Sequence, residues 1–156
     1  SLCLALSFLP KEYVGFGQEA FNRYATEAGE PVLVDGRWFR HGNGHEWKIV
    51  FEKAFEGDPH SGGITYDCEA GGFFCYAKSL PLIEDFGTRF RAICMDGERF
   101  TELVCTALKE DAERESRMER IRDTVRGFLT ENPQCNADIM TPDGLVRLTA
   151  GQGKQL

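Results

Sequence analysis

Residues 64–78, ITYDCEAGGFFCYAK, constrain the fold more than any other stretch of the chain. Apolar and polar residues alternate through ITYD, which predicts a strand at 64–67, and FFCYA is apolar throughout. Gly71-Gly72 permits a tight or bulged reversal between these two runs, so the stretch predicts a hairpin whose second strand is 72–77. Because a strand that is apolar on both faces is typical of mid-sheet positions, we expect both sides of 72–77 to be covered.

Two amphipathic helices are predicted to pack on this sheet. In EWKIVFEKAFEG, apolar residues recur at the spacing of one helical face, which predicts a helix at about 46–56. Ser79 as a cap and Pro81 in the first turn predict a second helix at about 80–94. The predicted core residues on these helices are Trp47, Phe51, Phe55, Phe86 and Phe90.

The N-terminal part of the chain predicts smaller elements. LALSF alternates like a first strand, and residues 11–29 follow helical spacing up to a capping glycine. PVLVDGRWFR predicts a hairpin with strands at 32–34 and 37–40, because Asp35-Gly36 readily adopts the positive φ angles of a two-residue turn.

The C-terminal part predicts a helix from Phe100 that either continues or restarts through Met118 to Phe128, and then a last hairpin. Helical spacing runs from Phe100 to Phe128 through the charge-rich LKEDAERESRMERIR, which is typical of a solvated helix face. ADIMTPDGLVRLTA predicts a hairpin with a Pro-Asp-Gly turn. The expected fold class is therefore α+β, with an antiparallel or mixed sheet, as a single domain over 1–150 and a frayed tail at 151–156.

The charge balance bears on the kind of partner. The chain has 18 Lys and Arg residues and 25 Asp and Glu residues, for a net charge of −7 and a pI near 5.0. An acidic surface repels phosphate backbones and attracts basic proteins, so direct nucleic-acid binding is disfavoured. No apolar run approaches the length of a membrane span, and no membrane partner is expected.

The cysteines and the first residues indicate the compartment. Six cysteines form no CxxC pair and lie mostly in apolar stretches, as free thiols do in a reducing compartment. The opening SLCLALSFLP is short and has no basic lead-in, so it does not read as an intact signal peptide. We therefore expect free thiols and a cytoplasmic location.

The middle of the chain also holds residue types that bind metals or attack substrates. Its candidate donors for zinc or for thiolate chemistry are His41, His45, His60, Asp58, Cys68 and Cys75. The histidine pair has the spacing of a zinc site but no helix to fix it, and the apolar neighbours of the cysteines favour inert burial. We expect no catalytic residue, metal or cofactor, and a small metal- or cysteine-dependent hydrolase remains the alternative.

The order of motifs in residues 41–105 carries a resemblance. GNGHEW is followed by a helix, by ITYDCEAGGFFCYA and by LIEDFGTRFRAICMDGERFTELV. This segment resembles the immunity protein 51 family of bacterial polymorphic-toxin systems. The matching residues are Gly42-Asn43-Gly44, Trp47, Asp67, Glu69-Ala70-Gly71 and Phe73 or Phe74, with a helical tail from Phe86 to Val104.

The resemblance implies an inhibitor that binds a cognate toxin domain in the cytoplasm of the producing cell. The acidity of the chain agrees with this, since many toxins that act on nucleic acids are basic. Neither the resemblance nor the charge indicates the toxin's identity or the oligomeric state. The candidate contact residues are carboxylates near turns and three aromatic anchors, namely Asp67, Glu69, Glu56, Asp58, Trp38, Phe39 and Tyr66.

Overall fold

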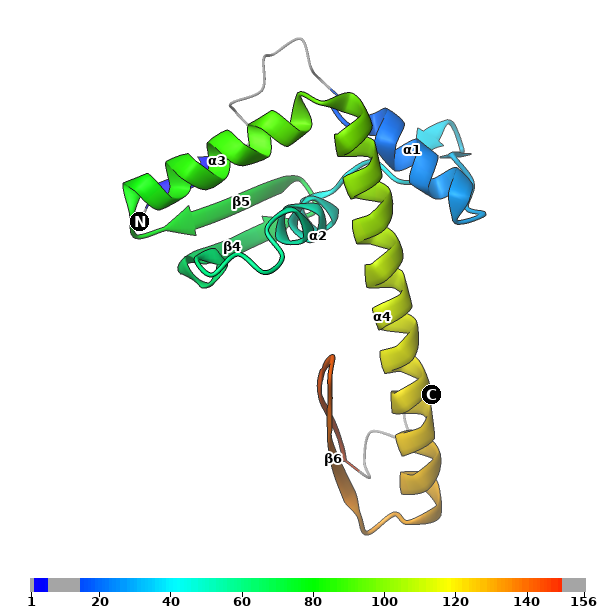
Figure 1. Cartoon of the computed structure of the whole chain (residues 1–156). Coiled ribbons are helices and arrows are strands. Elements are labelled where there is room, and N and C mark those ends of the chain that lie inside the picture. The colour runs from blue at the N-terminus through cyan, green and yellow to red at the C-terminus, as the bar shows by residue number, and fades with distance from the viewer. Residues whose placement is uncertain (1, 6–14, 150–156) are drawn as a thin grey trace. The chain divides into compact units, whose positions relative to one another are not determined.

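The computed structural model describes the backbone of residues 2–5 and 15–149 and the side chains of residues 15–148 (Figure 1). Its elements are β1 (Leu2–Ala5), α1 (Gln18–Glu27), β2 (Leu33–Val34), β3 (Arg37–Trp38), α2 (Gly44–Ala54), a 3-10 turn (Ser61–Gly63), β4 (Ile64–Glu69), β5 (Gly72–Ala77), α3 (Leu80–Cys94), α4 (Gly97–Glu131), β6 (Asn136–Thr141) and β7 (Gly144–Thr149). The chain divides into two compact units, Ser1–Lys109 and Glu110–Leu156, and α4 contributes to both.

The first unit is organised around an antiparallel sheet with the strand order β1-β5-β4. The predicted hairpin is confirmed as β4 and β5, in a register that places Asp67 opposite Phe74. β5 is the central strand, as predicted, and its buried residues are Phe73, Cys75 and Ala77. On its other face Phe74 is 36% exposed and Tyr76 is half-buried. The prediction that both faces are covered is therefore wrong at Phe74.

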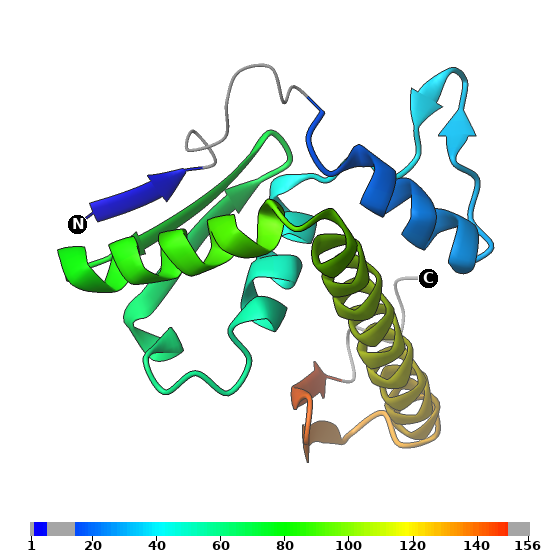
Figure 2. The same cartoon turned by 45° about the horizontal axis from the view of Figure 1, so that its top comes forward.

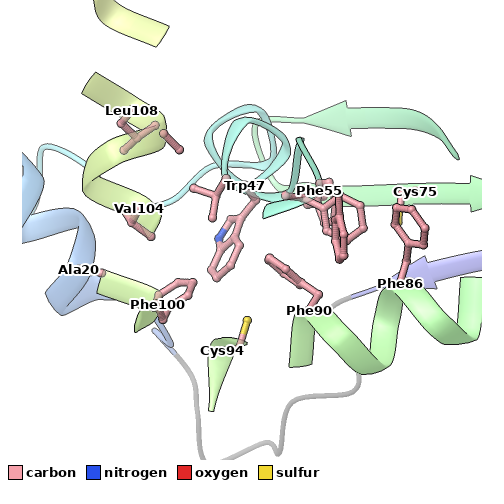
Figure 3. Packing of buried hydrophobic residues seen from close by; sticks show 14 of the residues in the cluster. Ala20, Trp47, Phe55, Cys75, Phe86, Phe90, Cys94, Phe100, Val104 and Leu108 are labelled. Carbon is pink, nitrogen blue, oxygen red and sulfur yellow. The ribbon is translucent and has the colours of Figure 1, made fainter. Parts of the chain in front are cut away.

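The two predicted helices both lie on the face of the sheet that carries Phe73 and Cys75. α3 begins and ends where the sequence predicts, and Ser79 caps it by accepting a hydrogen bond from a backbone amide. The rings of Phe51 on α2 and Phe90 on α3 lie 4.9 Å apart. Those of Phe55, just after α2, and Phe86 on α3 lie 4.4 Å apart (Figure 3). Both helices therefore share one side of the sheet. All five aromatic residues predicted for the core are buried.

α1 and the start of α4 extend this core (Figure 2). α1 falls within the predicted helix at 11–29, of which residues 11–14 lie outside the described part. Tyr24 of α1 donates a hydrogen bond to the carbonyl of Leu108 on α4 at 3.3 Å. The predicted first strand is observed as β1, and its continuation past residue 5 lies outside the described residues.

The predicted hairpin at 32–40 is present but short. Its strands β2 and β3 have two residues each, and Asp35 and Gly36 take φ angles of 51° and 75° in the turn, as predicted. Such a pair of two-residue strands has no covering layer of its own, so its side chains are mostly exposed.

The second unit consists of the C-terminal part of α4 and the hairpin β6–β7. The hairpin turn is at Pro142-Asp143, as predicted, and Asp143 forms an ion pair with Arg117 of α4 at 3.2 Å. The buried side chains of this unit's described residues are Met118, Val125, Leu129 and Val146.

The α+β class with antiparallel sheets and helices packed on them is confirmed. The boundaries predicted for one domain, 1–150, with a tail at 151–156, stay a prediction. Within the described residues, no helix combines the length and the apolar character needed to cross a membrane.

Candidate protein-binding surface

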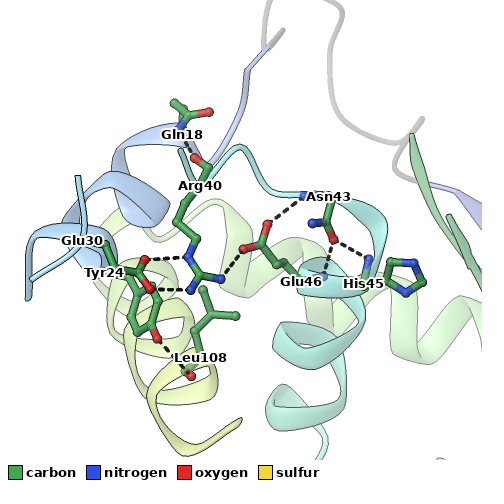
Figure 4. Close-up of polar contacts among 8 residues, drawn as sticks. All are labelled: Gln18, Tyr24, Glu30, Arg40, Asn43, His45, Glu46 and Leu108. Atoms are coloured by element: carbon green, nitrogen blue, oxygen red, sulfur yellow. Dashed lines mark hydrogen bonds and ion pairs between the residues drawn. The ribbon is translucent and has the colours of Figure 1, made fainter. Parts of the chain in front are cut away.

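Asn43, in the glycine-rich segment of the resemblance, fixes the start of α2 (Figure 4). Its side-chain oxygen accepts hydrogen bonds from the amides of His45 and Glu46 at 2.9 and 3.0 Å. Glu46 in turn accepts a hydrogen bond from the Asn43 amide at 3.0 Å, which completes a capping box. The helix therefore begins two residues before its predicted start.

The two glycines beside Asn43 allow close packing. A Cβ at Gly44 would lie 1.9 Å from the carbonyl oxygen of Gly72 and 2.3 Å from that of Glu69, so α2 begins directly against the β4–β5 turn. Gly42 has a φ of 67°, and a Cβ there would lie 2.7 Å from the ring of Phe21. The GNG motif therefore has a structural role, which its spacing alone does not reveal.

Arg40 links the loop before α2 to its neighbours (Figure 4). Its guanidinium donates to both carboxylate oxygens of Glu30, at 2.6 and 2.7 Å, and to Glu46 at 3.0 Å. The hydrogen bonds from Arg40 lower the pKa of Glu30, and those same bonds raise the pKa of Arg40. Gln18 donates to the Arg40 carbonyl at 2.7 Å, so the loop is held from both helices. Sequence reasoning missed this cluster because its members meet only in the folded chain.

Asp67 and Glu69 lie on the open face of the sheet. Both are exposed, and they alternate with the inward-facing residues of β4. Asp67 is directly opposite the exposed Phe74, which makes a small surface of two acids beside an aromatic ring. The turn that follows, Ala70-Gly71, is backed on one side by the start of α2, as the position of Gly44 shows.

Glu56 and Asp58 do not join these acids. α2 begins beside Glu69, and the chain after Asp58 turns directly into the opposite end of β4 at Ile64. The two pairs are thus separated by the length of the strand, about 17–20 Å. Glu56 pairs with Lys53 at 2.5 Å.

Asp58 is also engaged within the fold. Its carboxylate accepts hydrogen bonds from the His60 amide and from Arg89, each at 2.9 Å, and these bonds lower its pKa. Asp58 therefore stabilises the turn before β4.

Trp38 and Phe39 lie on the β2–β3 hairpin, and each is 45% exposed. Two aliphatic residues that sequence reasoning missed, Leu33 and Val34, are 52% and 44% exposed on the same hairpin. Leu33 is directly opposite Trp38, so they form one apolar surface. The signal for it was available, because a hairpin of such short strands cannot bury apolar residues on both of its arms.

Tyr66 lies on the covered side of the sheet and not beside Asp67. Its ring packs 6.1 Å from that of Phe51 and 6.3 Å from that of Phe73. Burial raises the pKa of its hydroxyl. The strand period of two places Tyr66 and Asp67 on opposite faces, so they cannot serve one flat contact surface.

The residues of the hydrolase alternative are dispersed. His41, His45 and His60 are exposed, whereas Cys75 is buried within the core. Among the residues that the structure describes, no three His, Cys, Asp or Glu side chains are grouped to hold a metal ion.

The cysteines with described side chains are free thiols, at positions 68, 75, 94, 105 and 135. Burial raises the pKa of Cys94 to about 12, which keeps that thiol protonated and unreactive. The prediction for Cys3 lies outside the described side chains.

Comparison with known proteins gives no relative: no family model, no curated protein and no solved structure matches the chain.

Proposed function

We propose that this chain is an immunity protein that binds a cognate bacterial toxin in the cytoplasm and occludes it. The observation that carries the proposal is the open face of the sheet, where the exposed acids Asp67 and Glu69 border the exposed ring of Phe74. Protein-binding surfaces have a polar rim around an apolar centre in which aromatic side chains are enriched, and these three residues have that composition.

The net charge of −7 supports a basic partner. Exposed acids raise the rate of association with a basic protein, and salt screens that effect. The aromatic ring supplies the desolvated contact that holds the complex once it has formed.

The apolar hairpin surface of Leu33 and Trp38 supports the same function through a second contact. Its side chains are exposed on strands too short to form a core of their own, and such groups are commonly covered by a partner. Trp38 is the stronger candidate anchor, because tryptophan is enriched among residues that dominate binding energy.

The experiment is to co-express the chain with the protein encoded by the adjacent open reading frame and to measure survival of the cells. Wild-type chain should protect, and the double variant Asp67→Lys/Glu69→Lys should lose protection while keeping its fold. Its association with the adjacent protein should slow most at low salt.

The matched control is Glu84→Lys/Glu102→Lys, which changes the net charge equally at two exposed positions on helices. If both double variants lose protection, only the overall charge matters and the site is wrong. If the wild type binds nothing and stoichiometric zinc is found in the purified protein, the hydrolase alternative gains support.

A further inference from the structure

β4 is an edge strand of the three-stranded sheet. Its hairpin turn has two residues, so Glu69 and Gly72 form the hydrogen-bonded pair that closes it. Hydrogen-bonded pairs then recur at every second residue, and the backbone groups of Thr65, Asp67 and Glu69 point toward β5. The backbone groups of Tyr66 and Cys68 therefore point away from the sheet.

These outward groups have no hydrogen-bond partner in the part of the chain that the structure describes. At the start of the strand, the Ile64 amide is satisfied by the Ser61 carbonyl. The amides and carbonyls of Tyr66 and Cys68 are left without such a partner among the described residues. Their spacing along the strand matches the hydrogen-bonding pattern of a neighbouring strand. An edge of this kind is a template for a further strand.

The side chains along the edge differ between its two faces. On the open face stand Asp67 and Glu69, two residues apart. On the covered face the half-buried ring of Tyr66 lies below Lys48 of α2, whose amino group is 5.3 Å from the ring centroid. A neighbouring strand would thus meet two acids on one face and an aromatic ring on the other.

We propose that the toxin docks by adding an extended segment to the open edge of β4. This segment carries Lys or Arg at the alternate positions that stand opposite Asp67 and Glu69, and apolar residues on the face toward Tyr66. The inference rests on the proposed function and specifies how the partner is held. Main-chain hydrogen bonds contribute the affinity, and the contacts of the alternating side chains contribute the specificity.

A second copy of this chain is a poorer occupant of the same edge. Antiparallel pairing of two β4 strands would bring the acids of both copies, Asp67 and Glu69, onto neighbouring strands. Like charges at that separation destabilise a sheet. Charge thus disfavours self-pairing and favours a basic segment of the toxin.

The test compares Cys68→Pro with Cys68→Ala in binding the protein from the adjacent open reading frame. Proline removes the outward amide of residue 68 without removing a hydrogen bond to β5, whereas alanine keeps that amide and also lacks the thiol. We expect the proline variant to bind at least about tenfold more weakly than the alanine variant. Proline has no amide hydrogen to donate to the added strand, and its ring hinders the neighbouring main-chain hydrogen bond. Equal binding by two folded variants overturns the inference and leaves the proposed function intact.

Amide hydrogen exchange decides the question without a substitution. In the complex, the amides of Tyr66 and Cys68 should exchange at least about tenfold more slowly than in the free chain, whereas those of Asp67 and Glu69 are already protected. Unchanged exchange at Tyr66 and Cys68 overturns strand addition even if the proline variant fails to fold. Protection of these amides in the free chain, with a dimer in solution, would assign the edge to a second copy. Failure of the adjacent protein to bind removes the proposed function and this inference together.

Discussion

The two units of the chain are stabilised to very different extents. The core of the first contains nine aromatic residues drawn from α1, α2, β5, α3 and α4. The described core of the second has only aliphatic members, on one helix and one hairpin, and its Phe128 is 52% exposed. Burial of a large apolar side chain contributes about 1.5–3 kcal/mol, so the first unit has by far the larger apolar stabilisation. An isolated hairpin is marginal in water, which makes the second unit the first candidate for local unfolding.

Residues 109–117 of α4 are mostly solvated. From Lys109 to Arg117 every side chain is exposed except Asp111, which is half-buried. The buried Leu108 and Met118 mark the two ends of this stretch. Helical stability there depends on local pairs such as Arg114 with Asp111, which contribute little each. This stretch of α4 therefore buries few side chains.

The largest expected effect comes from truncating an aromatic residue in the first core. Phe51→Ala should lower the free energy of unfolding by about 3–5 kcal/mol, because Phe51 is fully buried among other rings. Tryptophan fluorescence follows this unit alone, since both tryptophans, Trp38 and Trp47, lie in it.

Leu129→Ala is the matched change in the second core. It should shift the far-UV circular dichroism transition and leave the tryptophan transition in place, because Leu129 belongs to the other unit. A tryptophan transition that moves as far as the circular dichroism would mean that both units unfold as one domain, as the sequence predicts.

A smaller loss of stability is expected at Gly44. Gly44→Ala places a Cβ against two backbone carbonyls, which cannot move aside as a flexible side chain would. Overpacking of this kind costs about 1–3 kcal/mol, and it should appear in the thermal transition of the first unit. Gly97→Ala is the control, because Gly97 is likewise the first residue of a helix and a Cβ there meets no atom within 4 Å. Equal destabilisation by both variants would show that the approach of the β4–β5 turn does not govern position 44.

Next in size is the Arg40 cluster, whose contribution depends on pH. Arg40→Met leaves Glu30 and Glu46 without their ion pair and should cost about 1–2 kcal/mol at pH 7, given that these side chains are partly exposed. The pKa of Glu30 is lowered in the folded state, so its contribution is complete above its unfolded pKa and is lost as the pH falls through the folded value. The stability difference between wild type and variant should therefore shrink between pH 5 and pH 3. A difference that stays constant over that range would show that Glu30 is not the responsible group.

The smallest effect is expected from the ion pair of the second unit. Arg117 and Asp143 pair on a solvated helix face. Such a pair is screened by salt, and its formation costs the conformational entropy of two flexible side chains. Arg117→Ala should leave the circular dichroism transition unchanged within error. A clear loss of helix would mean that the hairpin depends on this pair and that the second core is weaker than its buried residues suggest.

Local signals in the sequence account for most of the elements. α3 is predicted to the residue because Ser79 and Pro81 mark its start, and the turns of two hairpins follow from Asp35-Gly36 and from Pro142-Asp143. The Asn43 capping box was also available as a signal, since Glu46 follows at the required spacing, and it would have corrected the start of α2.

What the sequence leaves open depends on contacts between distant segments. Nothing in the pattern of FFCYA shows that both helices cover the same side of the sheet, so Phe74 was expected to be buried. The ion pairs of Arg40 and the packing of Gly44 on the β4–β5 turn likewise arise only from the tertiary arrangement. Among the candidate contact residues, Asp67 and Trp38 are exposed, whereas Tyr66 packs against Phe51 on the covered side of the sheet, and their role in binding stays a prediction.

The pairing of β1 with β5 also sets an order of events during folding. β4 and β5 are joined by two residues and can pair as soon as both exist, whereas Leu2 must find Ala77 across nearly half of the chain. Loop-closure entropy delays that second pairing. Until β1 arrives, the second edge of β5, with its apolar GFFCYA, stays open to any other strand nearby. The nascent chain is therefore most exposed to aggregation in the interval between the hairpin and the complete sheet.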